Sequence, residues 1–159
     1  MSLNESLDST SIYISLKSRP TPGEYHWGLI LTDSNSKPVL HHATNIKGPW
    51  AYETLHDDAA SPMSLIALMK VGNIENYSLA EEIVQKVPAD GSPSWRTGES
   101  FTCRIWVKDA LVELHENGLT RLPVDIDTIE SKTIEYGLIL APLSETGNGP
   151  IVVSDSFGS

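Results

Sequence analysis

Residues 101–114 read FTCRIWVKDALVEL, and this stretch decides the fold. It contains Cys103, the only cysteine in the chain. At about 3.6 residues per turn its apolar side chains fall within one broad arc, which is the pattern of an amphipathic helix. Ser100 or Thr102 is expected to cap the N-terminus, and Gly118 to end the helix. The stretch therefore predicts a helix that packs on a core and carries Cys103 in its first turn.

The position of Cys103 bears on its chemistry. The thiolate is the nucleophilic form of cysteine, and the N-terminus of a helix stabilises negative charge. A histidine nearby would favour the thiolate further. A lone cysteine is more often a small apolar side chain of the core. The helix alone leaves both interpretations open, a nucleophile and a core residue.

Length and composition indicate one domain. The chain has 159 residues, of which 40% are hydrophobic, which is enough to bury a sizeable core. We expect a single domain over residues 11–143, a flexible N-terminus over residues 1–10 and a flexible C-terminal tail over residues 144–159. One cysteine excludes an internal disulfide, which fits a reducing compartment.

Charge and hydropathy limit the partners. The formal net charge is -10 and lysine and arginine form no cluster, so nucleic acid and anionic membrane surfaces are not expected as partners. The first residues are polar and acidic, unlike a secretory signal, and no apolar run is long enough to cross a bilayer. The sequence predicts a cytoplasmic location and leaves the oligomeric state open.

Hydrophobic alternation predicts four strands. Residues 11–16, 25–31 and 39–44 are strand-like, and the turn-forming residues 33–38 join the last two into a hairpin with histidines on both strands. The apolar run 65–71 suits a strand or a buried helix, and a strand is favoured. Together, these four segments predict a small antiparallel sheet.

Two further helices complete an α+β domain. Ser78 and Glu81 match a capping box that opens a short helix ending before Pro88. Asp125 or Asp127 is expected to cap another helix, whose apolar residues share one face.

The histidine strands supply a candidate base for Cys103. His26 shares a strand face with Gly28, whereas Trp27 points to the other face. A cysteine nucleophile needs a base and a third polar group that orients the base. Only one of His41 and His42 can share the face of His26, and we favour His42.

The remaining polar and aromatic residues are assigned to substrate contacts or to structure. We expect His41, Asn45, Trp50 and Trp27 to contact substrate, with Asn45 also a weaker candidate for orienting the base. Histidines and acids over residues 41–58 match no recurring ligand spacing, so we predict neither a metal site nor a cofactor.

The order of these parts resembles the permuted papain-like group, which includes lecithin:retinol acyltransferase-like proteins and small phospholipase/acyltransferases related to NlpC-type peptidases. The resemblance covers roughly residues 24–115 and rests on a His26-x-Gly28 strand, a second histidine strand and a final helix headed by Cys103. The chain is also similar to an uncharacterised family of small fungal proteins with His-Trp, His-x-x-Asn and Cys-x-x-Trp landmarks. The acyltransferase pattern selects His41 as the second histidine, whereas the fungal pattern selects His42.

The resemblance implies a circularly permuted papain-like fold, in which histidine strands pack on the helix that carries the cysteine. It also implies a hydrolase or an acyltransferase or cyclase that forms a thioester on an amide, ester or thioester substrate. Cys103 matches the nucleophile and His26 the base, and the backbone N–H of Cys103 would bind the oxyanion.

Two departures restrict what the resemblance carries over. The Asn-Cys-Glu-His-Phe motif of the acyltransferases is replaced here by residues 102–106, TCRIW, so their substrate preference is not expected. Their membrane-anchoring segment is also missing from the sequence. A small-molecule or acyl substrate is expected. A non-catalytic binding module on the same fold and a peptidase resembling deubiquitinating enzymes remain as alternatives.

Overall fold

The computed structural model describes residues 7–18, 25–46, 48–56, 65–143, 151–153 and 157. The chain is mixed α+β, as the sequence predicts. Its strands are β1 (Ser11–Ser18), β2 (Tyr25–Thr32), β3 (Pro38–Thr44), β4 (Ala51–Leu55), β5 (Leu65–Asn73) and β6 (Ile151–Val153), and its helices are α1 (Tyr77–Lys86), α2 (Cys103–Glu116) and α3 (Ile126–Leu143).

The six strands form one open sheet in the order β4-β3-β2-β1-β5-β6. Neighbouring strands are antiparallel except β5 and β6, which are parallel. The predicted hairpin of β2 and β3 is present, and Asp33 shapes its turn by accepting hydrogen bonds from the backbone N–H groups of Asn35 and Lys37. The run that begins at Leu65 is a strand, as favoured above.

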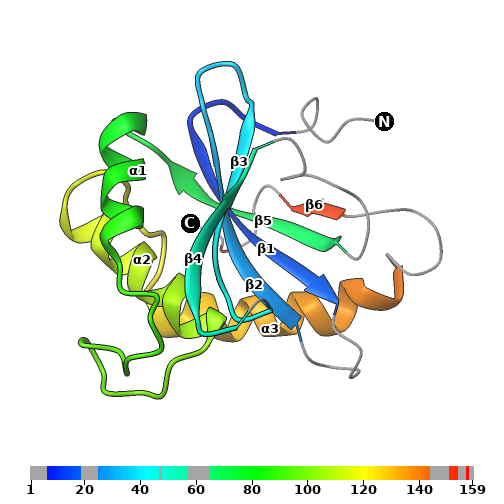
Figure 1. Ribbon diagram of the computed structural model, residues 1–159. Coiled ribbons are helices and arrows are strands. Elements are labelled where there is room, and N and C mark those ends of the chain that lie inside the picture. The colour runs from blue at the N-terminus through cyan, green and yellow to red at the C-terminus, as the bar shows by residue number, and fades with distance from the viewer. Residues whose placement is uncertain are drawn as a thin grey trace.

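The helices cover one face of the sheet (Figure 1). Helix α2 packs on β2 and β3, and α3 packs mainly on β5. The main apolar core lies between the sheet and the helices. A smaller apolar cluster lies on the opposite face and consists of Leu7, Tyr13, Ile30, Leu40 and Leu68. The two faces therefore provide two separate environments for side chains that alternate along each strand.

Helix α2 begins and ends where the sequence predicts. The side chain of Thr102 accepts a hydrogen bond from the backbone N–H of Ile105 at 3.1 Å, so Thr102, rather than Ser100, is the N-cap. Cys103 is the first helical residue. Gly118 follows the C-cap with a φ of 74°, a conformation that glycine adopts without strain.

Buried charges hold α2 in place. Lys108 is buried, and its Nζ lies 3.0 Å from Glu130 Oε1 on α3. Asp109 is also buried and accepts hydrogen bonds from Ser94 Oγ and Arg96 Nε, both at 3.0 Å. Ser94 and Arg96 belong to the loop that leads to Cys103. Partnered on both sides, α2 presents its N-terminus to the sheet at a fixed position.

The N-caps of the other two helices can be compared with the predicted ones. Asn76, not Ser78, is the N-cap of α1, and its Oδ1 accepts a hydrogen bond from Leu79 N at 3.1 Å. The capping-box prediction was therefore wrong by two residues, because asparagine caps as well as serine and lies in the extended conformation a cap requires. For α3, the side chain of Asp125 accepts a hydrogen bond from Thr128 N.

Part of the segment predicted to be a flexible tail belongs to the sheet. Val152 of β6 pairs with Leu68 of β5, and Phe157 is buried beside Tyr136. The unpaired edge of β5 and the apolar run 151–153 supply the reason, since a strand pairs readily with such an edge. Residues 1–6 of the predicted flexible N-terminus lie outside the described residues.

None of the described helices combines the length and the apolarity needed to span a membrane.

Candidate active site

The sulfur of Cys103 lies against the backbone of β2. The backbone N–H of Trp27 donates a hydrogen bond to Cys103 Sγ, with 3.4 Å between the nitrogen and the sulfur. Trp27 directly follows His26, so the sulfur lies one residue from the predicted base. Cys103 is buried, with 5% of its surface exposed.

The pairing of β2 with β3 explains where α2 meets the sheet. Their paired residues run from Thr32 with Pro38 to Leu29 with His41. The next part of β2 toward its N-terminal end contains His26 and Trp27. The N-terminus of α2 therefore reaches β2 just beyond its paired segment with β3, where the backbone N–H of Trp27 donates to the sulfur.

His26, His42 and Glu53 form a hydrogen-bonded chain across three neighbouring strands. His26 Nε2 lies 2.7 Å from His42 Nδ1, and His42 Nε2 lies 2.8 Å from Glu53 Oε1. His42 and Glu53 are directly paired in the register of β3 with β4. His26 is half-buried and His42 is buried. The structure thus brings together two of the three predicted catalytic residues and adds a carboxylate.

The hydrogen-bonded chain fixes the tautomers of the neutral imidazoles. The ionised carboxylate of Glu53 can only accept, so His42 carries its proton on Nε2 and accepts at Nδ1. His26 then donates from Nε2, which leaves its Nδ1 unprotonated. Burial lowers the pKa of His42, although its hydrogen bond to Glu53 opposes this shift, so His42 is neutral at pH 7. His26 Nδ1 is therefore the nitrogen that carries no proton in this tautomer.

Gly28 lets the two histidine strands approach closely. A Cβ atom at Gly28 would lie 2.8 Å from Leu40 Cδ1, 2.9 Å from Ser15 Oγ and 3.4 Å from His42 Cβ. These contacts place Gly28 and His42 on the sheet face away from the helices. Because side chains alternate along a strand, His26 shares this face, whereas Trp27 faces the helices and packs in the main core.

His41 lies on the helix-covered face. It is fully buried, with its Nδ1 2.6 Å from the hydroxyl of Tyr52 and its Nε2 3.8 Å from Glu81 Oε2 on α1. Burial, together with the smaller effects of the charges of His56 and His42, lowers the pKa of His41 to about 4. His41 is therefore a neutral core histidine at pH 7 and does not contact His26.

The other predicted substrate-contacting residues lie in different surroundings. Trp27 is buried in the main core, and Asn45 is exposed after β3. Trp50 is half-buried, with its ring centroid 4.9 Å from that of Phe101, two residues before Cys103. Of the four, Trp50 is the one that lies near the N-terminus of α2 while retaining exposed surface. Their contacts with substrate stay a prediction.

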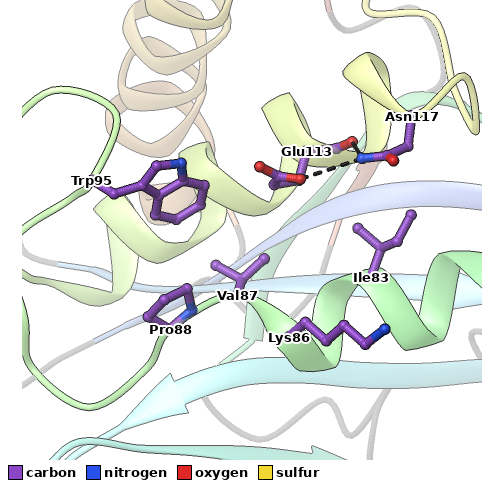
Figure 2. A pocket seen from close by; sticks show the side chains of 7 residues that line it. All are labelled: Ile83, Lys86, Val87, Pro88, Trp95, Glu113 and Asn117. Carbon is purple, nitrogen blue, oxygen red and sulfur yellow. Dashed lines mark hydrogen bonds between the residues drawn. The ribbon is translucent and has the colours of Figure 1, made fainter.

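A separate pocket of about 440 Å³ lies between the C-terminal end of α1 and the C-terminal half of α2 (Figure 2). Its polar wall contains Glu113, whose carboxylate accepts a hydrogen bond from Asn117 Nδ2 at 3.3 Å. Glu113 lies roughly 15 Å along the helix from Cys103, at 1.5 Å per residue. The pocket lining contains none of the predicted site residues; it consists of Ile83, Lys86, Val87, Pro88, Trp95, Glu113 and Asn117.

Among the residues that the structure describes, no three or more histidine, cysteine or acidic side chains are grouped so as to hold a metal ion.

Comparison with known proteins gives one match. Residues 10–138 match a family of unknown function, DUF6914. The chain belongs to the DUF6914 family. No curated protein and no solved structure matches it. The DUF6914 match contains Cys103 and the whole hydrogen-bonded chain from His26 to Glu53, so these residues lie within the family domain.

Sequence reasoning missed two groups at this DUF6914 site. Glu53 was not considered, although antiparallel pairing centred on residues 45–50 would have placed it opposite His42. The backbone N–H of Trp27 carries no sequence signal, because any residue except proline would supply it.

Proposed function

We propose that this protein is a cysteine-dependent hydrolase or acyltransferase or cyclase that forms a thioester intermediate, with Cys103 as nucleophile and His26 as base. The observation that carries the proposal is the hydrogen bond from Trp27 N–H to Cys103 Sγ, because it joins the head of α2 to the strand that carries His26. The substrate would be an amide, an ester or a thioester.

The surroundings of the sulfur support a nucleophilic role. A helix N-terminus and a backbone N–H donor both stabilise negative charge on a nearby atom. Cys103 has both, as the first residue of α2 and the acceptor of the Trp27 hydrogen bond. The tautomer argument adds a base, since His26 Nδ1 is left without a proton when Glu53 orients His42.

The reaction proceeds in two steps. His26 Nδ1 takes the proton from the thiol as the sulfur attacks the carbonyl carbon, and the backbone N–H of Cys103 binds the oxyanion. The bond to the leaving group breaks, the leaving group takes the proton from His26, and a thioester remains. Water then attacks the thioester to give an acid and the free thiol, whereas an amine or an alcohol gives a transfer or cyclisation product.

Glu53 has a supporting role in this mechanism. Its carboxylate stabilises the positive charge that the two imidazoles share after His26 takes the proton. A third polar group that orients the base is the usual requirement of cysteine nucleophiles. His42 and Glu53 together would meet it.

The order of parts along the chain supports a permuted papain-like arrangement. Two histidine strands, β2 and β3, precede the cysteine helix α2 and pack against it. Cys103 and His26 approach β2 from different faces, at the part of this strand that lies beyond its paired segment with β3.

A non-catalytic binding module is the second candidate, and two observations favour it. Cys103 has only 5% of its surface exposed, and its sulfur packs on the helix-covered face. The His26 imidazole bonds to His42 on the other face. A structural cysteine beside a polar cluster that binds a ligand would show the same features.

Labelling of the single cysteine separates the two candidates. We expect iodoacetamide to alkylate Cys103 of the native protein at pH 7, with intact mass as the measurement. The His26→Ala variant should react at least about 10-fold more slowly, as expected for loss of a general base, and Glu53→Gln should show a smaller effect. His115→Ala, at an exposed histidine of α2, is the matched control.

The rate of global unfolding is the reference with which the labelling rate is compared. A sealed core cysteine reacts only when the protein unfolds, so its labelling rate follows the unfolding rate measured in denaturant and extrapolated to water. If wild type and His26→Ala are labelled at that same slow rate, the enzyme proposal is rejected and the binding module is favoured.

A further inference from the structure

A row of four polar side chains crosses the sheet on the face away from the helices. Glu53, His42 and His26 come from β4, β3 and β2 and are joined by hydrogen bonds of 2.8 and 2.7 Å. Lys17 of β1 continues the row, because it is directly paired with His26 in the register of β1 with β2. Directly paired residues project to the same face with Cβ atoms roughly 5 Å apart. The row therefore begins with a carboxylate and ends with an ammonium group.

Lys17 differs from most other cations of similar burial. It is half-buried, and within the described ranges no carboxylate forms an ion pair with it, a feature that it shares with half-buried Lys132 of α3. The other cations with reduced exposure each pair with an acid; they are Lys70, Arg96, Arg104 and Lys108. Of Lys17 and Lys132, Lys17 is the one that is directly paired with His26 in the sheet. The chain has 21 acidic residues, so acidic partners are plentiful in general.

The positive charge of Lys17 disfavours uptake of a proton by the neighbouring histidines. Burial is the main reason that the pKa of His42 is low, and the charge of Lys17 lowers this pKa further. A cation beside a histidine pair disfavours the imidazolium that a general base must form. An anion bound at Lys17 would cancel this repulsion.

We propose that Lys17 forms an anion subsite next to His26 and that the substrate carries a carboxylate near the bond to be broken. The catalytic part rests on the proposed function, whereas anion binding beside the histidines does not. One ammonium group balances one carboxylate, so a half-ester or half-amide of a short dicarboxylic acid fits better than a neutral acyl chain. Glu53 lies at the far end of the row and does not occupy the subsite.

The first experiment measures binding without turnover. Monomethyl glutarate, a monoanion, is titrated into the protein while the imidazole nitrogens are followed by NMR. We expect saturable shifts at His26 and His42 in wild type and in Lys17→Arg, and an affinity at least about 10-fold weaker in Lys17→Gln. Lys132→Gln, at a lysine of α3 that is half-buried like Lys17, is the matched control and should bind as wild type. Equal shifts in wild type and Lys17→Gln, or none in either, would overturn the subsite.

The second experiment compares two activated esters of similar length. We expect wild type to hydrolyse mono-p-nitrophenyl glutarate with a kcat/KM at least about 10-fold above that for p-nitrophenyl butyrate. Lys17→Gln should lose this preference, Lys17→Arg should retain it, and Cys103→Ser should hydrolyse neither ester.

The outcomes of the two experiments distinguish failure of the subsite from failure of the proposed function. Hydrolysis of both esters with a ratio that Lys17→Gln does not alter would overturn the subsite and leave the proposed function standing. Binding of monomethyl glutarate at the histidines without hydrolysis of either ester, in a wild type that iodoacetamide labels no faster than it unfolds, would reject the hydrolase and support the subsite.

Discussion

At the scale of single residues, two adjacent histidines have opposite roles because a strand sends them to opposite faces. His42 joins His26 and Glu53 on the open face of the sheet, whereas His41 is enclosed between the sheet and α1. The hydroxyl of Tyr52 gives His41 one partner, and its Nε2 has no hydrogen-bond partner. A buried imidazole in such surroundings must stay neutral for the fold to be stable.

This burial predicts a pH dependence of stability that belongs to His41. Its pKa in the folded chain is about 4, below the ordinary 6.5, so the unfolded chain binds the proton more tightly. The free energy of unfolding should be highest above pH 6.5 and fall as the pH drops toward 4, by roughly 3 kcal/mol from this residue alone.

Urea unfolding at several pH values between 7 and 4 measures this effect. His41→Gln should show a smaller loss of stability over that range, because glutamine does not take up a proton. His42, whose pKa burial also lowers, contributes equally to both proteins and cancels in the comparison. His115→Gln should keep the wild-type slope. An unchanged slope in His41→Gln would show that His41 is not the group that titrates.

At the scale of elements, the N-terminus of α2 is the part that local sequence controls most directly. Thr102 satisfies the N–H of Ile105 and so fixes the residue at which the helix begins. A shift of one residue would rotate Cys103 by about 100° around the helix axis and move its sulfur from the Trp27 amide. The cap therefore sets both helix stability and the position of the thiol.

Replacement of Thr102 by alanine tests this link. Thr102→Ala should lower the free energy of unfolding by about 1 kcal/mol, the usual effect of losing a side-chain cap, and should change the iodoacetamide labelling rate of Cys103. Thr102→Ser keeps the hydroxyl and should resemble wild type in both measurements. An alanine variant with unchanged stability in urea would contradict the assignment of Thr102 as the cap.

At the scale of the whole molecule, one end of the described chain packs on the sheet and the other adds a strand to it. Leu7 packs in the apolar cluster on the open face, and β6 adds a parallel strand to the edge of β5. Phe157 then fills a position in the main core beside Tyr136. Edge strands left unpaired expose backbone groups that can pair with another chain.

Truncation of the C-terminal segment should therefore destabilise the entire domain. A chain that ends at residue 148 lacks β6 and Phe157, and we expect its free energy of unfolding to fall by at least about 3 kcal/mol. The freed edge of β5 should also promote self-association, measured by size-exclusion chromatography with light scattering. A chain lacking only residues 158 and 159 is the control. Equal stability and equal mass for both variants would show that β6 contributes little.

Local patterns in the sequence determined the elements that carry the candidate chemistry. The helix headed by Cys103, its end at Gly118 and the strands of His26 and His42 all follow from short-range periodicity and capping, whereas the choice of Thr102 over Ser100 as the cap came from the structure. Such features depend on neighbours within a few residues, so they can be predicted directly from the sequence. The permuted papain-like fold and the thioester chemistry stay proposals, since they rest on resemblance.

Only the tertiary structure decided which side chains meet. The register of β3 with β4 brings Glu53 to His42, and the register of β1 with β2 brings Lys17 to His26. The docking of α2 sends Cys103 to the backbone of Trp27. These contacts join residues far apart in the chain, and their geometry depends on how all the elements pack at once, which no local pattern encodes.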